Sequence, residues 1–378
     1  MSSVSDIIPS AGIADAEVQS GQVHWHAGPN GQLFELATLP ERLCSLDVPF
    51  SLVSEQSQIK LACGGSIHFD ANTVDESAYQ HLAFVPKQSI QTLGNKQFCQ
   101  NYGLKYPYMT GSMANGIASV ELVEVIAKAD MLASFGAAGL SLAEVEKAIQ
   151  RLQAAIPDKP FCFNLIYSPN EKGHEDAIVD LYLRYGVDLV ETSAYMKLTL
   201  PVVRYRVKGI HKDAQGNMVV PNRIIAKASR VELASKWFSP PPEKLLNELL
   251  VQGAITNEEA ELAKEIPMAQ DLTVEADSGG HTDNRPAITL LPTMLALRDQ
   301  IQAEYNYAHE LRVGAAGGIA TPASALGAFA MGAAYIVTGT VNQACKESGS
   351  SDIVRNMLAN TGQADVTMAP AVDMFEMG

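Results

Sequence analysis

The chain reads Val313-Gly314-Ala315-Ala316-Gly317-Gly318-Ile319-Ala320-Thr321-Pro322 near its end, where an apolar strand runs into two glycines and a helix follows. Glycine lets the backbone approach a ligand closely and turn its N–H groups inward. The helix that begins near Pro322 adds the positive end of its dipole, which favours a phosphate. This segment therefore predicts a phosphate-binding turn after a buried strand.

A second turn of the same kind lies downstream, where residues 331–340 read MGAAYIVTGT. Another buried strand ends there in Gly339 and Thr340, whose backbone N–H and hydroxyl can bind the same phosphate. Loops after strands 7 and 8 are the usual phosphate site of a (β/α)₈ barrel. Either turn alone is equally consistent with an ordinary tight connection, but the pair at this spacing favours phosphate binding.

The pattern upstream of these turns predicts the barrel itself. From about residue 104, short apolar runs alternate with amphipathic segments of helical period, which is typical of βα units. Eight candidate strands favour a closed TIM (β/α)₈ barrel over an open sheet. The candidate strands are residues 106–110, 130–134, 161–166, 188–192, 223–227, 272–276, 311–315 and 335–338. The candidate helices are residues 119–129, 141–155, 175–185, 289–305 and 321–331.

Further segments surround this barrel. The chain has 378 residues, more than the roughly 250 that one barrel needs. We expect a mobile leader at 1–20, a small β-rich unit at 21–103 and the barrel at 104–378, with helical insertions at about 198–222 and 238–268. The first insertion contains a hairpin turn at residues 213–217. The second contains a helix start with Thr256 as N-cap and Glu259 three residues on.

Composition argues against several classes of protein. Hydrophobic residues make up 47% and charged residues 18%, which favours a large core over disorder. A net charge of −15 argues against nucleic-acid binding. The five cysteines are scattered without metal-ligand spacing, so we expect free thiols and no metal site. Neither a signal peptide nor the ~20 apolar residues of a membrane span can be recognised, so a soluble cytoplasmic protein is predicted.

Polar residues follow several other predicted strands. Residues 275–282 read EADSGGHT, and Gly279 and Gly280 would let this loop pass close to a flat ring. His281 is the best general acid or base in the chain, because imidazole titrates near neutral pH. A purely structural loop histidine is the alternative.

Lys227 and Asn164 each close an apolar strand at the expected mouth of the barrel. The lysine can stabilise negative charge on a bound ring, and the asparagine can hydrogen-bond the ring edge. The alternatives are a snorkelling surface lysine and a turn-capping asparagine. The first strand ends in a small-residue loop, MTGSMANG at 109–116, which suits backbone contacts to a ring.

Together these motifs resemble the nitronate monooxygenase (2-nitropropane dioxygenase-like) family, which includes FMN-dependent enoyl reductases of fatty acid synthesis. The resemblance rests on MTGSMA (109–114), Asn164, Lys227, ADSGGH (276–281), AGGI (316–319) and the MGAA and TGT of 331–340. The stretches at 275–286, 226–230 and 368–378 resemble more narrowly the PfaD type, which comprises trans-acting enoyl reductases of polyunsaturated fatty acid and polyketide synthases. The N-terminal unit and both insertions also fit that subgroup. Its members usually continue beyond the position of Gly378, which raises the hypothesis that this chain is a fragment.

The resemblance implies a role for each site residue. It assigns the FMN phosphate to Gly317, Gly318, Gly339 and Thr340. It assigns the ring to Thr110, Gly111, Asn164 and Lys227. The remaining predicted cofactor-binding residues are Ser112, Asp277, Gly279 and Gly280. His281 matches a histidine near the flavin with an acid/base role. The implied reaction is reduction of 2-enoyl thioesters on acyl carrier protein, in which NADPH reduces FMN and the flavin passes on the hydride.

Two other functions and a docking hypothesis stay open. A nitronate monooxygenase would share the FMN site but use O₂, and a non-catalytic barrel would serve as a scaffold. Residues 204–236 hold eight basic residues against two acidic ones, a segment that could dock acidic carrier protein or the 2′-phosphate of NADPH. A solvated insertion without a partner is the alternative. A homodimer is the hypothesis for the assembly.

Overall fold

The computed structural model of this protein describes residues 23–45, 47–69, 78–171, 173–280 and 283–369. The chain divides into two compact units, Met1–Ile90 and Gln91–Gly378. No helix within the described ranges has the length and apolar character needed to cross a bilayer.

The first unit is built around an antiparallel sheet with the strand order β2-β4-β3-β6-β1-β5. Its strands are β1 (His24–His26), β2 (Gln32–Glu35), β3 (Phe50–Glu55), β4 (Gln58–Cys63), β5 (Ser66–His68) and β6 (Ala78–Val85), and helix α1 spans Leu39–Leu43. Successive side chains point to opposite faces of a strand. Leu61 and Ala62 accordingly lie in two separate small clusters, so both faces of the sheet bury apolar groups.

The second unit contains a closed barrel of eight parallel strands in the order β10-β13-β14-β15-β16-β7-β8-β9. The strands are β7 (Tyr108–Thr110), β8 (Leu132–Phe135), β9 (Cys162–Ile166), β10 (Leu189–Ser193), β13 (Arg223–Ala228), β14 (Asp271–Glu275), β15 (Arg312–Ala316) and β16 (Ile336–Thr338). All eight predicted barrel strands are confirmed. No strand end lies more than two residues from its predicted position.

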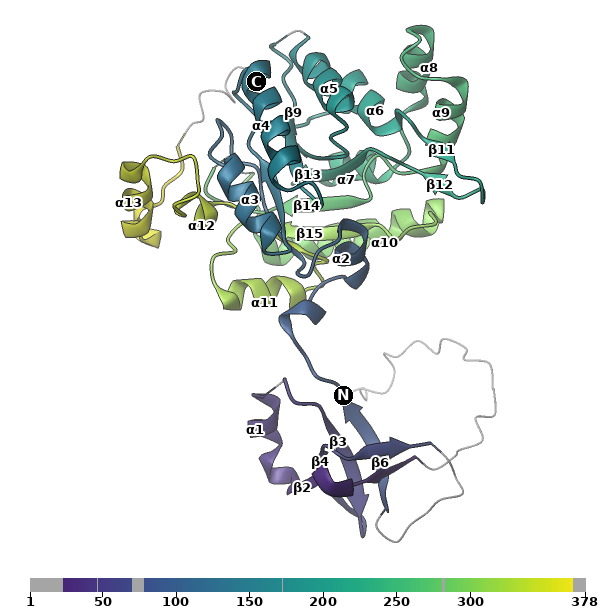
Figure 1. The fold of residues 1–378 in the computed structure, drawn as a ribbon, viewed down its shortest axis with the longest axis vertical. Helices are drawn as coiled ribbons and strands as arrows, with labels where there is room; N and C mark the ends of the chain where they lie inside the picture. The colour runs from purple at the N-terminus through teal and green to yellow at the C-terminus, as the bar shows by residue number, and fades with distance from the viewer. Residues whose placement is uncertain (1–22, 46, 70–77, 172, 281–282, 370–378) are drawn as a thin grey trace, which may run out of the picture. The chain divides into compact units, whose positions relative to one another are not determined.

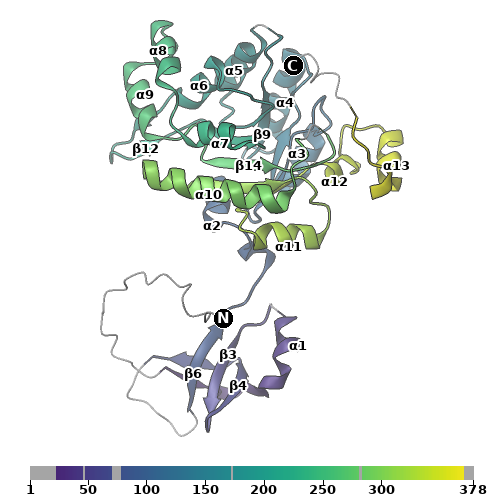
Figure 2. The same ribbon diagram turned by 180° about the vertical axis from the view of Figure 1, so that it is seen from behind.

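Helices surround these strands, as Figures 1 and 2 show, and the long helix α10 crosses the outside of the barrel in Figure 2. The helices of this unit are α2 (Lys96–Tyr102), α3 (Val120–Lys128), α4 (Leu142–Ala155), α5 (His174–Tyr185), α6 (Leu200–Val207), α7 (Val231–Phe238), α8 (Glu243–Val251), α9 (Asn257–Leu262), α10 (Ala287–Tyr305), α11 (Pro322–Ala330), α12 (Thr340–Gln343) and α13 (Asp352–Asn360). Side-chain caps start many of them. Ser141, for example, accepts a hydrogen bond from the Glu144 N–H at the start of α4.

Both predicted features of the insertions are confirmed. Strands β11 (His211–Lys212) and β12 (Met218–Val219) pair as a hairpin. The Asp213 carboxylate accepts the N–H groups of Gln215 and Asn217 in the turn between them. A reciprocal capping box joins Thr256 and Glu259 at the start of α9.

Side chains of the barrel strands alternate between the interior and the surrounding helices. Leu189 and Ile225 belong to one buried cluster inside the barrel. Val190 and Ala226, their next neighbours along the chain, belong to the larger cluster under the helices. This period of two decides which residues reach the mouth of the barrel.

Candidate active site

Four polar side chains lie inside the barrel where the strands end, because each stands two residues after an inward-facing one. Asn164 follows Cys162 on β9, Glu191 follows Leu189 on β10, and Lys227 follows Ile225 on β13. Glu275 follows Thr273 in the same way on β14. The carboxyl ends of the strands are where barrels of this type carry their active sites.

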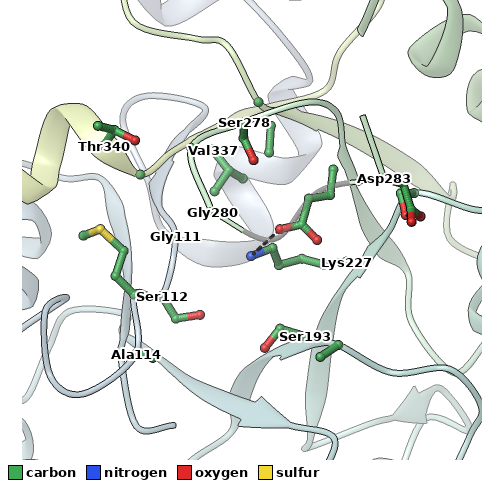
Figure 3. A pocket seen from close by; sticks show the side chains of 18 of the residues that line it. Gly111, Ser112, Ala114, Ser193, Lys227, Ser278, Gly280, Asp283, Val337 and Thr340 are labelled. Carbon is green, nitrogen blue, oxygen red and sulfur yellow. Dashed lines mark hydrogen bonds and ion pairs between the residues drawn. The ribbon is translucent and has the colours of Figure 1, made fainter. Parts of the chain in front are cut away.

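A cavity of about 1240 Å³ opens at this end of the barrel. It is lined by loops that follow several strands, and Figure 3 shows Gly111, Lys227, Ser278 and Thr340 around it. Ten of the twelve predicted cofactor-contacting residues line it. They are Gly111, Ser112, Asn164, Lys227, Gly279, Gly280, Gly317, Gly318, Gly339 and Thr340.

The glycine turns after β14, β15 and β16 meet at one side of this cavity. Gly317 has φ +96°, and a Cβ on it would lie 2.5 Å from the Ala276 carbonyl oxygen. A Cβ on Gly279 would lie 3.2 Å from Thr340 Oγ1. Only a residue without a side chain fits at 317, because both its backbone angle and the adjacent backbone exclude one. The two predicted phosphate turns therefore lie at one site.

Lys227 carries a charge between two carboxylates. Its Nζ lies 3.2 Å from Glu275 Oε1 and 3.9 Å from Glu191 Oε1, and its side chain is only 12% exposed. Figure 3 marks an ion pair of this lysine with a dashed line. Burial alone lowers the pKa of Lys227, but the adjacent Glu275 and Glu191 outweigh burial and raise it above its ordinary value. The ammonium is therefore charged at neutral pH.

Glu191 is a site residue that belongs to none of the sequence motifs described above. One of its oxygens, Oε2, accepts the Ser112 N–H at 2.7 Å and also the Ser112 hydroxyl. The signal was present in the sequence, since Glu191 is an acidic residue directly after the apolar pair Leu189 and Val190 of a predicted strand. Strand alternation would have placed it on the same face as Lys227.

The loop after β7 is anchored by consecutive amides. The Gly111 N–H donates to the Thr338 carbonyl at 3.0 Å, on β16, while the Ser112 N–H donates to Glu191 on β10. Neither N–H is available to a ligand. A Cβ on Gly111 would lie 2.9 Å from Val337 Cγ1, so glycine is needed here for space.

Asn164 is oriented by the neighbouring strand. Its side-chain amide nitrogen donates to the Glu191 carbonyl at 3.2 Å and to Ser193 Oγ at 2.9 Å. Because the nitrogen is committed to β10, the amide oxygen is the atom that the side chain can offer to a ligand in the cavity.

Two predicted cofactor contacts do not line the cavity, and the predicted catalytic residue cannot be placed. Thr110 is fully buried, and strand alternation turns its side chain away from the barrel interior, because Met109 and Gly111 face inward. Asp277 is exposed, and its N–H donates to the Arg285 carbonyl at 2.8 Å. His281 lies outside the described residues.

Most charges of the basic segment at 204–236 are paired within the fold, which favours the alternative of a solvated insertion over a docking surface. Arg204 pairs with Asp176 and Asp180. Arg206 is buried and donates to the carbonyls of Pro267 and Asn222. Charge reversal at these two arginines would therefore disrupt internal contacts. The segment's other basic residues are Lys208, Lys212, Arg223, Lys227, Arg230 and Lys236, of which only Lys236 has no ion pair within the described ranges.

Comparison with known proteins shows the family to which this chain belongs. The family model described as nitronate monooxygenase matches residues 96–376. A polyunsaturated fatty acid synthase polypeptide of Thraustochytrium sp. is 45% identical over 354 residues, which are 93% of this chain and 23% of that protein. Polyketide biosynthesis protein PksE of Bacillus subtilis is 45% identical over 291 residues, which are 77% of this chain and 38% of that protein. The chain thus spans less than half the length of either curated relative.

A solved structure supports the same fold. The enoyl reductase domain of MlnA, from the macrolactin biosynthesis cluster of Bacillus amyloliquefaciens, superposes with a TM-score of 0.74 at 37% sequence identity. The match covers 77% of this chain and 66% of that one.

Proposed function

This chain belongs to the nitronate monooxygenase family, and we propose that it is an FMN-dependent enoyl reductase. Its substrates would be 2-enoyl thioesters carried by acyl carrier protein domains, reduced with NADPH during polyunsaturated fatty acid or polyketide synthesis, with the enzyme acting in trans. The observation that carries this proposal is the similarity to the enoyl reductase domain of MlnA in a chain whose ring-side and phosphate-side residues share one cavity.

The residues present fit FMN. Gly317 and Gly318 both have positive φ, and they lie with Gly339 and Thr340 at one wall of the cavity, where backbone N–H groups and a hydroxyl suit a phosphate. The volume of about 1240 Å³ exceeds the roughly 300–1,000 Å³ of ordinary ligand pockets. That space leaves room for a second ligand beside the cofactor.

When bound, FMN would supply the hydride chemistry between NADPH and the β-carbon of the enoyl thioester. Lys227 would hold a fixed positive charge beside the ring, because its two carboxylate neighbours keep it protonated. The Asn164 oxygen would accept a hydrogen bond from the ring edge. The ring would be bordered by Gly111, Ser112, Gly279 and Gly280. The side chains of Thr110 and Asp277 do not line the cavity, so these two residues would contribute through their backbone or through neighbouring residues. His281 stays the predicted source of the proton for the α-carbon.

The first experiment measures what the whole protein does with cofactor and substrate. We expect purified protein incubated with FMN and freed of excess cofactor to be yellow, and NADPH to bleach it without oxygen. Addition of a crotonyl thioester should restore the colour and sustain NADPH oxidation, which can be followed by the loss of the nicotinamide absorbance.

A parallel assay tests the alternative, which the family's name itself favours. Oxygen uptake with an alkyl nitronate, and no turnover of the thioester, would assign the chain to nitronate oxidation and overturn the reductase proposal. Protein that stays colourless with FMN would overturn both assignments and favour a scaffold role.

A further inference from the structure

The Glu191 carboxylate is buried without being fully satisfied. Its side chain is 0% exposed, and Oε2 accepts both the N–H and the hydroxyl of Ser112. The other oxygen, Oε1, has no hydrogen-bond partner within the described ranges. Its nearest cation is Lys227, whose Nζ is 3.9 Å away.

Charge balance does not require this carboxylate. Glu275 lies closer to Lys227 Nζ, at 3.2 Å, and is 33% exposed, so it can neutralise the lysine at a smaller desolvation cost. With Glu191 present, two carboxylates face one ammonium. A buried carboxylate with one oxygen unsatisfied is unfavourable for folding. Its presence therefore points to a role other than stability.

The contacts of Glu191 indicate that role. The carboxylate bridges two elements that are remote in the chain, the loop after β7 through Ser112 and strand β13 through Lys227. Oε1 also lies near Gly111, since a Cβ on that glycine would lie 3.5 Å from it. An ammonium has three donors. Of the two carboxylates only Glu275 lies within hydrogen-bond distance of Lys227 Nζ, at 3.2 Å, so the ammonium has N–H groups left for the cavity, which the lysine lines.

We propose that Glu191 is a positioning residue that holds the Gly111–Ser112 loop and the Lys227 ammonium in one fixed arrangement and so preorganises the ring side of the cofactor site. This inference rests on the proposed function, because it concerns the site assigned to FMN. Preorganised groups bind a ligand more tightly, since their ordering cost is met during folding.

The test compares two isosteric variants, Glu191→Gln and Glu275→Gln, by titration of flavin fluorescence on the apoprotein. Each removes one negative charge beside Lys227, but only Glu191→Gln also replaces the charged acceptor of the Ser112 N–H and hydroxyl by a neutral amide oxygen, which is a weaker acceptor. We expect Glu191→Gln to raise the Kd for FMN about tenfold or more, and Glu275→Gln to raise it by clearly less. The affinity of Glu191→Gln for riboflavin, which lacks the phosphate, should fall by the same factor as its affinity for FMN, because the substitution lies on the ring side.

Several outcomes would overturn the proposal. Equal losses in the two variants would assign the effect to charge alone, and unchanged FMN and riboflavin affinities in Glu191→Gln would remove any positioning role. If Glu191→Gln does not fold, Ser112→Ala provides the second variant, because it deletes the hydroxyl half of the same contact. It should shift both flavin affinities together by a smaller factor, and unaltered affinities would again contradict the proposal. Wild-type protein that binds no flavin would instead refute the proposed function.

Discussion

The two ends of the barrel carry the same kinds of charged groups but pair them differently. We call the end where the strands begin the floor, and the end where they finish, beside the cavity, the mouth. At the floor, Arg312 makes two hydrogen bonds to Asp271, at 2.6 and 2.8 Å, and Tyr102 donates to the same carboxylate at 2.7 Å. At the mouth, Lys227 faces both Glu191 and Glu275, and one oxygen of Glu191 has no hydrogen bond within the described ranges.

The difference follows from what each end must admit. Helix α2 packs against the floor, where Phe98 stacks on Tyr335 with ring centroids 4.2 Å apart. No ligand has to enter there, so Arg312 and Asp271 can satisfy each other's hydrogen bonds. The mouth is bordered by a cavity, so some of its polar atoms are left for a ligand. We therefore expect changes at the floor to act on stability and changes at the mouth to act on binding.

The largest expected effect is at the floor. Asp271→Asn leaves Arg312, which is 1% exposed, without a counter-charge. Breaking a buried pair by removing one partner costs about 3–5 kcal/mol, so the free energy of unfolding in urea should fall by about that amount.

The double variant Asp271→Asn with Arg312→Met is the matched control for the floor. It removes the unpaired charge, so it should recover much of the lost stability. An Asp271→Asn protein as stable as wild type would show that the floor is not closed by this pair, and the comparison of the two ends would break down.

An intermediate effect is expected from Gly317→Ala, at the phosphate side of the mouth. A Cβ there would lie 2.5 Å from the Ala276 carbonyl oxygen, and the residue would have to keep φ near +96°. Strain of this kind costs about 1–3 kcal/mol, so the FMN affinity of the apoprotein should fall by roughly tenfold or more.

Riboflavin binding distinguishes a defect on the phosphate side of the site from a defect on the ring side in this variant. Because the lesion lies where the phosphate is assigned, riboflavin should bind Gly317→Ala nearly as well as it binds the wild type. Gly327→Ala, inside helix α11 with no atom within 4 Å of the added Cβ, is the control and should leave both affinities unchanged. Equal weakening of FMN and riboflavin in Gly317→Ala would contradict the assignment.

The smallest effect is expected from an exposed pair at the rim of the mouth. Asp283 accepts hydrogen bonds from Arg230 and Ser229, and these bonds lower the pKa of Asp283 below its ordinary value. The stabilisation is therefore present above the ordinary aspartate pKa, about 3.9, and is lost as the pH falls through the lowered folded value.

Because solvent screens this pair, its contribution should stay below about 1 kcal/mol. The measurement compares the unfolding free energies of wild type and Asp283→Asn between about pH 7 and pH 3. Their difference should be small at neutral pH and shrink toward zero in acid. A difference as large as that of Asp271→Asn would remove the distinction between rim and floor.

The sequence alone was enough to locate the barrel strands and the glycine turns, because both depend on local patterns. Apolar runs such as Phe161–Ile166 are short and bounded by turn residues, so their strands could be predicted to within two residues. The glycines of the turn at 317–318 are likewise a local pattern, although the approach of the Ala276 carbonyl to Gly317 comes from the tertiary structure.

Only the tertiary structure decided which charges meet. Glu191 is joined to Ser112 and Lys227, which are 79 and 36 residues away along the chain, because closure of the barrel places β7, β10 and β13 around one interior. Packing of helix α6 against its neighbours likewise buried Arg206 and paired Arg204 with Asp180 on α5. Sequence patterns report the period of one strand at a time, whereas the partner of a charge depends on which strands become neighbours in space.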